Sequence, residues 1–98
     1  MKGSERNAKA HEFFKAGEID KAIELYEMNV QLKHDGAIAY NRLITIYSKS
    51  NDVQNELRVL KMYLVIAQKS AKECNERIKQ QKNEIVDFIQ TRINKLSA

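Results

Sequence analysis

The amino-acid sequence predicts an all-α fold, a short solenoid of about five helices in antiparallel pairs. Proline is absent and glycine occurs only three times, so the chain has few of the turn residues that a sheet requires. Apolar residues recur three or four positions apart, as in amphipathic helices. The sequence also nearly repeats itself with a period of about 34 residues, which is typical of a two-helix unit that must stack on a copy to bury its apolar face. The repeated positions are Ala10 and Ile44, Phe13 and Tyr47, Lys15 and Lys49, Glu18 and Asp52, Ile19 and Val53, Ile23 and Leu57, Tyr26 and Leu60, and Val30 and Leu64.

The whole chain of 98 residues is predicted to form one domain. The repeat divides it into residues 3–36, residues 37–69 and a last segment, residues 70–98. A chain of this length buries only about two-thirds of the surface that its unfolded form exposes, so we expect a thin core.

The first repeat is predicted to hold two helices, over residues 4–16 and residues 18–33. Gly17 separates them, as glycine does where a helix ends in the left-handed conformation. The apolar positions of this pair are Ala8, Ala10, Phe13, Phe14, Ala22, Ile23, Tyr26, Met28 and Val30.

The second repeat is predicted to hold helices over residues 37–49 and residues 52–68. Gly36 follows Asp35, a suitable N-cap, and Ser50, Asn51 and Asp52 supply three capping side chains between the helices. The inward positions are predicted to be Tyr40, Leu43, Ile44, Tyr47, Val53, Leu57, Leu60, Tyr63 and Leu64.

The last helix is predicted over residues 71–96, although neither glycine nor proline occurs after Asp52. Ser70 and Glu73 have the spacing of a capping box, which predicts a turn at Lys69 and Ser70. The alternative is one continuous helix, which would leave the apolar face of the fourth helix poorly covered. The apolar stripe is Ala71, Cys74, Ile78, Ile85, Phe88, Ile89, Ile93 and Leu96, and Val86 falls outside it.

The charge of the chain is modestly basic, with 17 Lys and Arg against 13 Asp and Glu. The excess is spread over the second and third segments, so most charges are expected on solvated helix faces. A dedicated nucleic-acid binder usually has a denser basic stripe. The N-terminal residues are charged and no long apolar run occurs, so we expect no signal peptide, no membrane span and a cytoplasmic location.

Residues that could support catalysis or metal binding do not gather in the sequence. Cys74, the only cysteine, falls on the apolar stripe of the last helix, which favours an inert buried thiol. His11 and His34 lie on different elements with no evident third ligand. No nucleophile–base pair, phosphate loop or pair of catalytic carboxylates stands out. We therefore expect a protein that is not an enzyme and has no cofactor.

Residues 3–70 resemble two copies of the tetratricopeptide repeat. That pattern places a small residue and an aromatic on the first helix, Ala and an aromatic four residues later on the second helix, and proline at the end. The matching residues are Ala10, Phe13, Gly17, Ala22 and Tyr26 in the first copy and Tyr40, Leu43 and Tyr47 in the second. The resemblance implies that the last segment is a capping helix.

The sequence also departs from this pattern. Glu56 stands where alanine is usual, and Leu60 replaces the aromatic of the second helix. Ile44 replaces the small residue of the second copy, and neither copy ends in proline.

The resemblance implies a concave groove lined by the first helix of each repeat. By register this groove would present Asn7, His11, Phe14, Lys15, Ile38, Asn41, Arg42, Thr45, Lys49, Lys72, Asn75 and Lys79. Asn7 and Asn41 occupy equivalent positions, and asparagine can bond both the N–H and the C=O of an extended peptide. Arg42, Lys49 and Lys72 would favour an acidic partner. The alternative is that these are solvated residues on an exposed face.

Some proteins of this family hold a chaperone C-terminus with a Lys and Asn clamp. This chain has Asn7, His11 and Arg42 at the clamp positions, so we do not expect chaperone binding.

The last helix offers a second candidate site. It would extend about 39 Å, against about 20 Å for a helix of the family, so residues beyond Lys82 would overhang the stack. An exposed apolar stripe there would bind a second copy or a partner. The alternative is that this end folds against the fourth helix or frays. The association residues would be Ile85, Phe88, Ile89, Ile93 and Leu96.

Together these features predict a protein–protein interaction module, an adaptor or a regulatory or assembly subunit. It would bind a peptide in the groove and associate through its C-terminal helix. Two other functions stay open. One is binding of an anionic surface or nucleic acid through Arg42, Lys49, Lys72, Lys79 and Lys82, and the other is purely structural homo-oligomerisation.

Overall fold

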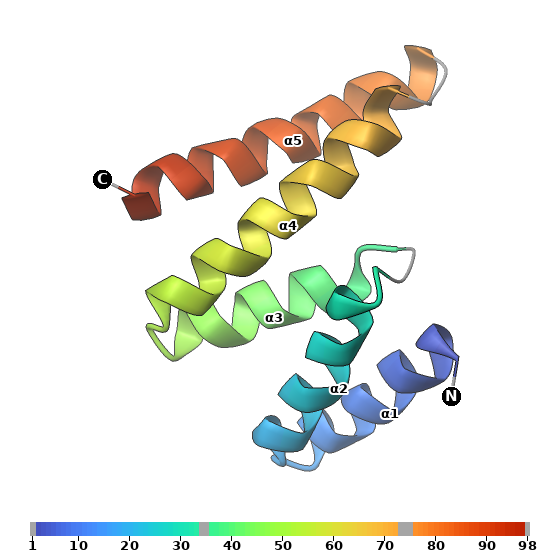
Figure 1. The fold of residues 1–98 in the computed structure, drawn as a ribbon, viewed down its shortest axis with the longest axis vertical. Helices are drawn as coiled ribbons and strands as arrows, with labels where there is room; N and C mark the ends of the chain where they lie inside the picture. The colour runs from blue at the N-terminus through green and yellow to red at the C-terminus, as the bar shows by residue number, and fades with distance from the viewer. Residues whose placement is uncertain (1, 34–35, 73–75, 98) are drawn as a thin grey trace.

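The computed structural model of the 98-residue chain describes residues 2–33, 36–72 and 76–97, with the main chain alone for residues 70–72, 76–79 and 82. These residues form five helices and no strand, and each helix packs against the next in chain order (Figure 1). The predicted all-α, solenoid-like fold is confirmed. None of the helices in these ranges is both long and apolar enough to cross a membrane. The helices are α1 (Gly3–Lys15), α2 (Ile19–Gln31), α3 (Ile38–Lys49), α4 (Val53–Lys72) and α5 (Glu76–Ser97).

The two repeats turn in the same way at equivalent positions. After α1, Gly17 has φ +82°, its N–H bonds the Phe14 carbonyl, and the Glu18 N–H bonds the Phe13 carbonyl. After α3, Asn51 has φ +58°, and the N–H groups of residues 51 and 52 make the equivalent two bonds. Both are the left-handed C-terminal motif that satisfies the last carbonyls of a helix. Asn51 therefore ends α3 in the left-handed conformation, as Gly17 ends α1.

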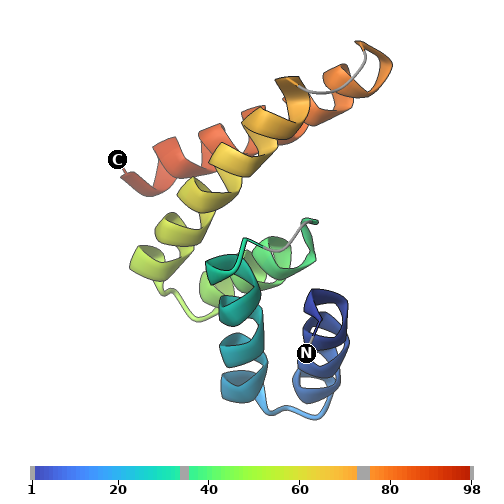
Figure 2. The same ribbon diagram turned by 45° about the vertical axis from the view of Figure 1, so that its right-hand side comes forward.

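Asp52 caps the start of α4, as the run of capping side chains predicts. Its Oδ1 accepts a hydrogen bond of 3.3 Å from the Asn55 backbone N–H, and its Oδ2 accepts one of 2.7 Å from Asn55 Nδ2. Because α2 starts at Ile19 and α4 starts at the equivalent position, Val53, the two antiparallel pairs stack in register. Figure 2 shows α1 and α2 as one hairpin, with α4 and α5 at the other end of the molecule.

The hydrophobic core lies where successive helices pack against each other. The small residues Ala10 and Ala22 are fully buried, which lets α1 and α2 approach closely. Tyr40 and Tyr63 stack with ring centroids 5.2 Å apart and join α3 to α4, so Tyr63 belongs to the core as predicted. The buried apolar residues are Ala10, Ala22, Tyr26, Val30, Ala39, Tyr40, Leu43, Ile46, Tyr47, Val59, Leu60, Tyr63, Ala67, Ile89 and Ile93.

Glu56, the residue that stands where alanine is usual, is buried and paired. Its carboxylate accepts hydrogen bonds from Arg92 Nε (2.8 Å) and Arg92 Nη2 (3.2 Å), and Nη2 also bonds the Ser48 hydroxyl at 3.2 Å. Arg92 therefore fixes α5 to both α3 and α4. A buried acid of this kind is tolerated only when it is paired and hydrogen-bonded.

The prediction of a turn at Lys69 and Ser70 is wrong, because α4 continues through both residues to Lys72. Ala71 and Lys72 are strong helix formers and no glycine or proline stops the helix, so local propensity outweighs the capping pattern. Lys72 consequently belongs to α4 and not to the last helix. The expected N-cap at Asp35 and the buried thiol of Cys74 lie outside the described residues.

The last helix folds back along α4, which decides between the two alternatives left open by the sequence. Ile89 is fully buried and Ile93 is 7% exposed, so this end of α5 does not overhang. The part of the hairpin that reaches beyond α1, α2 and α3 is its other end, because α4 and α5 have 20 and 22 residues against 12 or 13 in the earlier helices (Figure 1).

The buried stripe of α5 differs from the one predicted. Val86 and Leu96 pack against the core together with Ile89 and Ile93, whereas Ile85 and Phe88 are 42% and 67% exposed. In α4, Val53 was expected inward and is 44% exposed. The antiparallel pairing with α4 rotates α5 so that the stripe 86, 89, 93 and 96 faces inward.

Candidate functional site

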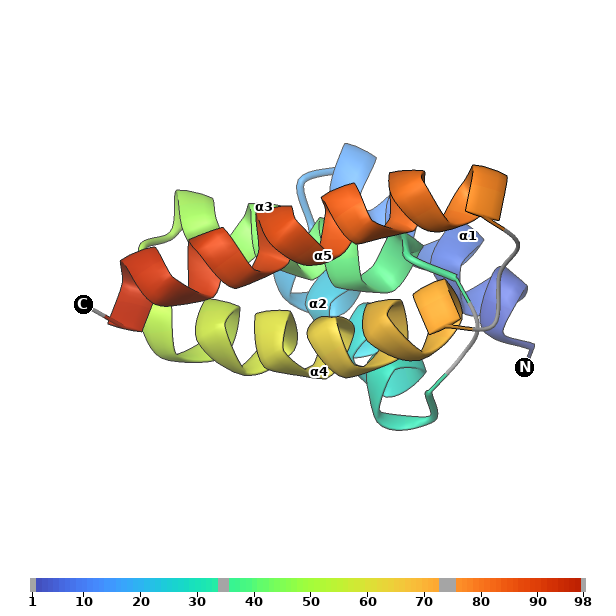
Figure 3. The same cartoon turned by 90° about the horizontal axis from the view of Figure 1, so that it is seen from above.

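A hollow of about 590 Å³ lies between α1 and α3, and five of the twelve predicted groove residues line it. Asn7 and His11 come from α1, and Asn41 and Arg42 come from α3. Residues of both helices line the same hollow, so α1 and α3 face it together. Figure 3 shows that α3 and α5 lie on the side opposite α4. The lining residues are Ser4, Asn7, Ala8, His11, Tyr26, Gly36, Ile38, Asn41 and Arg42.

No negative charge is found among the described side chains that line this hollow. Arg42 carries a positive charge and His11 can gain one. Both residues are exposed, so they can reach a ligand. A carboxylate or another anion is the complementary ligand.

The floor of the hollow is Tyr26 of α2, whose side chain is completely buried. Its hydroxyl has no hydrogen-bond partner among the described residues. Burial raises the pKa of this hydroxyl, and the positive charge of Arg42 lowers it in part. A buried hydroxyl without a partner is costly, but less than 1 Å² of this oxygen is exposed, so a ligand in the hollow reaches it only if the neighbouring side chains move.

Arg42 lies over the ring of Phe14, one of the four predicted groove residues on α1. The guanidinium carbon lies 5.8 Å from the centroid of the Phe14 ring, within the range of a cation–π contact. Phe14 itself is half-buried and packs against the core. It therefore positions the arginine across the groove and is not among the residues that line the hollow.

Asn7 is only partly available as a peptide-binding residue. Its side-chain Oδ1 accepts a 2.7 Å hydrogen bond from Nδ2 of Asn29, a fully buried residue of α2. Asn29 also donates to the Gly3 carbonyl at 2.9 Å and accepts from Arg6 Nη1 at 3.2 Å, so it fixes the first turn of α1. Sequence reasoning missed Asn29, because an asparagine on the second helix of the repeat gives no signal of burial.

Three of the remaining groove predictions, Lys15, Thr45 and Lys49, are not among the residues that line the hollow. Thr45 is exposed and its hydroxyl donates to the Asn41 carbonyl within α3 at 2.9 Å, and Lys49 is exposed in the last turn of α3. The side chains of Lys72, Lys79 and Lys82 are outside those described, as is Asn75.

A second hollow of about 310 Å³ lies between α3 and α5 and shares the lining residue Asn41 with the first. It is lined by Asn41, Tyr63, Gln81, Glu84, Ile85 and Phe88. Two of the five predicted association residues, Ile85 and Phe88, lie here and are exposed. Ile89 and Ile93 are buried inside the chain and Leu96 packs against the core, so these three are engaged in folding.

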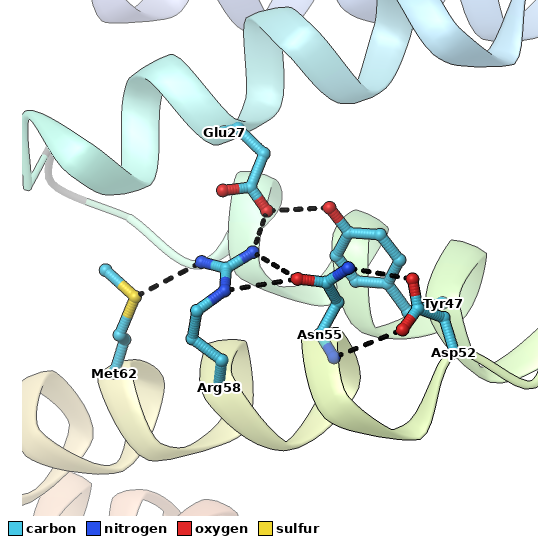
Figure 4. Close-up of polar contacts among 6 residues, drawn as sticks. All are labelled: Glu27, Tyr47, Asp52, Asn55, Arg58 and Met62. Carbon is cyan, nitrogen blue, oxygen red and sulfur yellow. Dashed lines mark hydrogen bonds and ion pairs between the residues drawn. The ribbon is translucent and has the colours of Figure 1, made fainter.

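A polar network joins α2, α3 and α4 on a different part of the surface (Figure 4). Glu27 Oε1 accepts hydrogen bonds from the Tyr47 hydroxyl (2.8 Å) and from Arg58 Nη2 (2.6 Å). Arg58 also donates to Asn55 Oδ1. Burial and the hydrogen bond to Glu27 raise the pKa of Tyr47, and the same carboxylate raises the pKa of Arg58. This network ties the first repeat to the second.

A shallower hollow of about 480 Å³ lies beside this network, lined by Gln54, Leu57, Arg58, Lys61 and Met62 of α4 alone. Because Arg58 is already paired with Glu27, we assign the network to the stack and not to a ligand. In the described ranges no three His, Cys, Asp or Glu side chains gather as metal ligands would.

Comparisons of this chain with protein-family models, with curated proteins and with solved structures find no match. The case for a function therefore rests on the residues and geometry given above.

Proposed function

We propose that this chain is a protein–protein interaction module built from two tetratricopeptide-like repeats, and that the hollow between α1 and α3 binds an acidic peptide segment. The observation that carries the proposal is the hollow itself. It has about 590 Å³ and Arg42 and His11 on its walls, and it lies over the buried Tyr26 hydroxyl, which has no hydrogen-bond partner among the described residues.

The size and the chemistry of the hollow suit a peptide. Clefts that bind small ligands typically measure about 300–1,000 Å³, and a side chain with its adjoining backbone is within that range. An acidic side chain or a terminal carboxylate would pair with Arg42. The amide of Asn41, on the exposed face of α3, can donate to and accept from the backbone of the same segment.

The assignment of two repeats has separate support. The helices, their left-handed turns and the buried positions Ala22 and Glu56 recur at equivalent places in the two halves of the repeat. In stacked repeats the exposed polar face of the first helices is the usual binding surface.

A selection from random 12-residue peptides displayed on phage tests the proposal, with the intact chain as bait. Peptides enriched on the wild-type chain should contain Asp, Glu or a free carboxylate. Arg42→Glu should abolish the enrichment, because it reverses the charge of the hollow. Lys49→Glu is the matched control, since it makes the same charge reversal on the same helix outside the hollow. The proposal fails if no peptide is enriched, or if Arg42→Glu and Lys49→Glu behave alike.

A further inference from the structure

Ile85 and Phe88 form an exposed apolar pair that the folding of α5 does not explain. They are three residues apart and so lie on the same face of the helix, 42% and 67% exposed. Single exposed apolar residues are ordinary. This pair, however, borders the 310 Å³ hollow between α3 and α5, and the core residue Tyr63 lines the same hollow.

The two hollows meet at Asn41, which lines both of them. Their charges differ. The hollow between α1 and α3 carries Arg42 and His11, whereas Glu84 is the charged residue among the described side chains that line the hollow between α3 and α5. A single segment that crosses α3 would therefore place its acidic group at the Arg42 end, since Glu84 would repel it at the other.

We propose that the hollow between α3 and α5 is an apolar subsite for the same peptide segment whose acidic group binds beside Arg42. The occupant is an extended segment of a partner protein with a carboxylate at one end and a large apolar side chain, such as Leu or Phe, against Phe88 and Ile85. Asn41 bonds the backbone between them. This inference rests on the proposed function, because it takes the acidic end of the segment as bound.

The subsite explains why α5 presents Phe88 to solvent while burying Ile89. An apolar anchor in a pocket beside a charged contact is the common arrangement of residues that dominate a binding interface. The polar residues around the pair, Gln81 and Glu84, would form the rim that surrounds such an anchor.

The test uses acidic peptides from the phage selection, synthesised with a fluorescent label, and measures their affinity for the intact chain by anisotropy. The enriched sequences should share a large apolar residue at a fixed distance from the acidic one. Phe88→Ser should weaken binding by about fivefold or more. Replacing the apolar residue of the peptide with alanine should weaken it by a similar factor, and the two changes together should weaken it little further.

Val65→Ser is the matched control, because Val65 of α4 is 66% exposed and does not line the hollow. It should leave the affinity unchanged. If Arg42→Glu abolishes binding while Phe88→Ser has no effect, the subsite is wrong and the acidic groove stands. If neither variant matters, the proposed function fails as well. If light scattering finds a dimer that Phe88→Ser converts to a monomer, a second copy occupies the surface and the inference is overturned.

Discussion

Removing Arg92 should destabilise the chain strongly, because it leaves the carboxylate of Glu56 buried without its partner. Glu56 is 2% exposed, and Arg92 supplies two charge-assisted hydrogen bonds to it. Breaking such a pair typically costs about 3–5 kcal/mol. The Arg92 side chain is 29% exposed, so some water reaches the pair, and we expect Arg92→Met to cost about 3 kcal/mol. The total free energy of unfolding of a chain of 98 residues is only about 5–15 kcal/mol.

Urea unfolding followed by the helical circular dichroism signal measures this loss. Glu56→Met should cost less, because the guanidinium left behind is close enough to solvent to be hydrated. The double variant Glu56→Met with Arg92→Met should lie within about 1 kcal/mol of the wild type, since two apolar side chains can replace a buried ion pair. The double-mutant cycle formed by these variants should then give a coupling energy between Glu56 and Arg92 of about 2 kcal/mol or more.

The reasoning is refuted if Arg92→Met unfolds within about 1 kcal/mol of the wild type, well below the cost of breaking a buried pair. It is also refuted if the losses in the two single variants add in the double variant, because residues that form one pair do not act independently.

Two further predictions concern the backbone and the buried tyrosines. Lys33 has φ +53°, which is unfavourable for a side chain with a Cβ, so Lys33→Gly should raise the free energy of unfolding in urea by about 0.5–1 kcal/mol; an unchanged or lower value would contradict this. Burial raises the pKa of Tyr26, Tyr40 and Tyr47 above the ordinary value of about 10. The unfolded chain therefore loses these protons first. The free energy of unfolding therefore keeps its full value below pH 10. Above pH 10 it should fall by up to about 1.4 kcal/mol per pH unit for each tyrosine. In Tyr63→Phe, where only these three tyrosines remain, tyrosinate absorbance should rise together with the loss of helix, and an earlier rise would show that the hydroxyls are accessible.

The fold could be predicted mostly from the period of the repeat. That period predicts the helix pairs, their register and the turns between them. It also makes Asn51 equivalent to Gly17, and the structure shows both residues in the left-handed conformation. The boundary between α4 and α5 could not be placed as well, since Ser70 combines a capping signal with strong helix formers on both sides. The rotation of α5, which buries Val86 and exposes Phe88, depends on its packing against α4 and not on its own spacing.

The candidate site was predicted in part. Helical register was sufficient to bring Asn7, His11, Asn41 and Arg42 to one hollow. Register does not report which buried groups lie beneath a surface, so Tyr26 was assigned only to the core. Glu56 illustrates the same limit. Its departure from the repeat pattern was visible in the sequence, but its partner Arg92 lies on a later helix whose packing the sequence did not fix.

The most direct test of the peptide-binding groove is a ¹⁵N–¹H correlation spectrum of the intact chain, titrated with the acidic peptide that the phage selection enriches most. We predict chemical-shift changes that concentrate on the residues lining the two hollows, Asn7, His11, Asn41 and Arg42 foremost. Changes centred instead on Leu57, Arg58 and Met62 of α4, or spread evenly over the chain, would contradict this prediction.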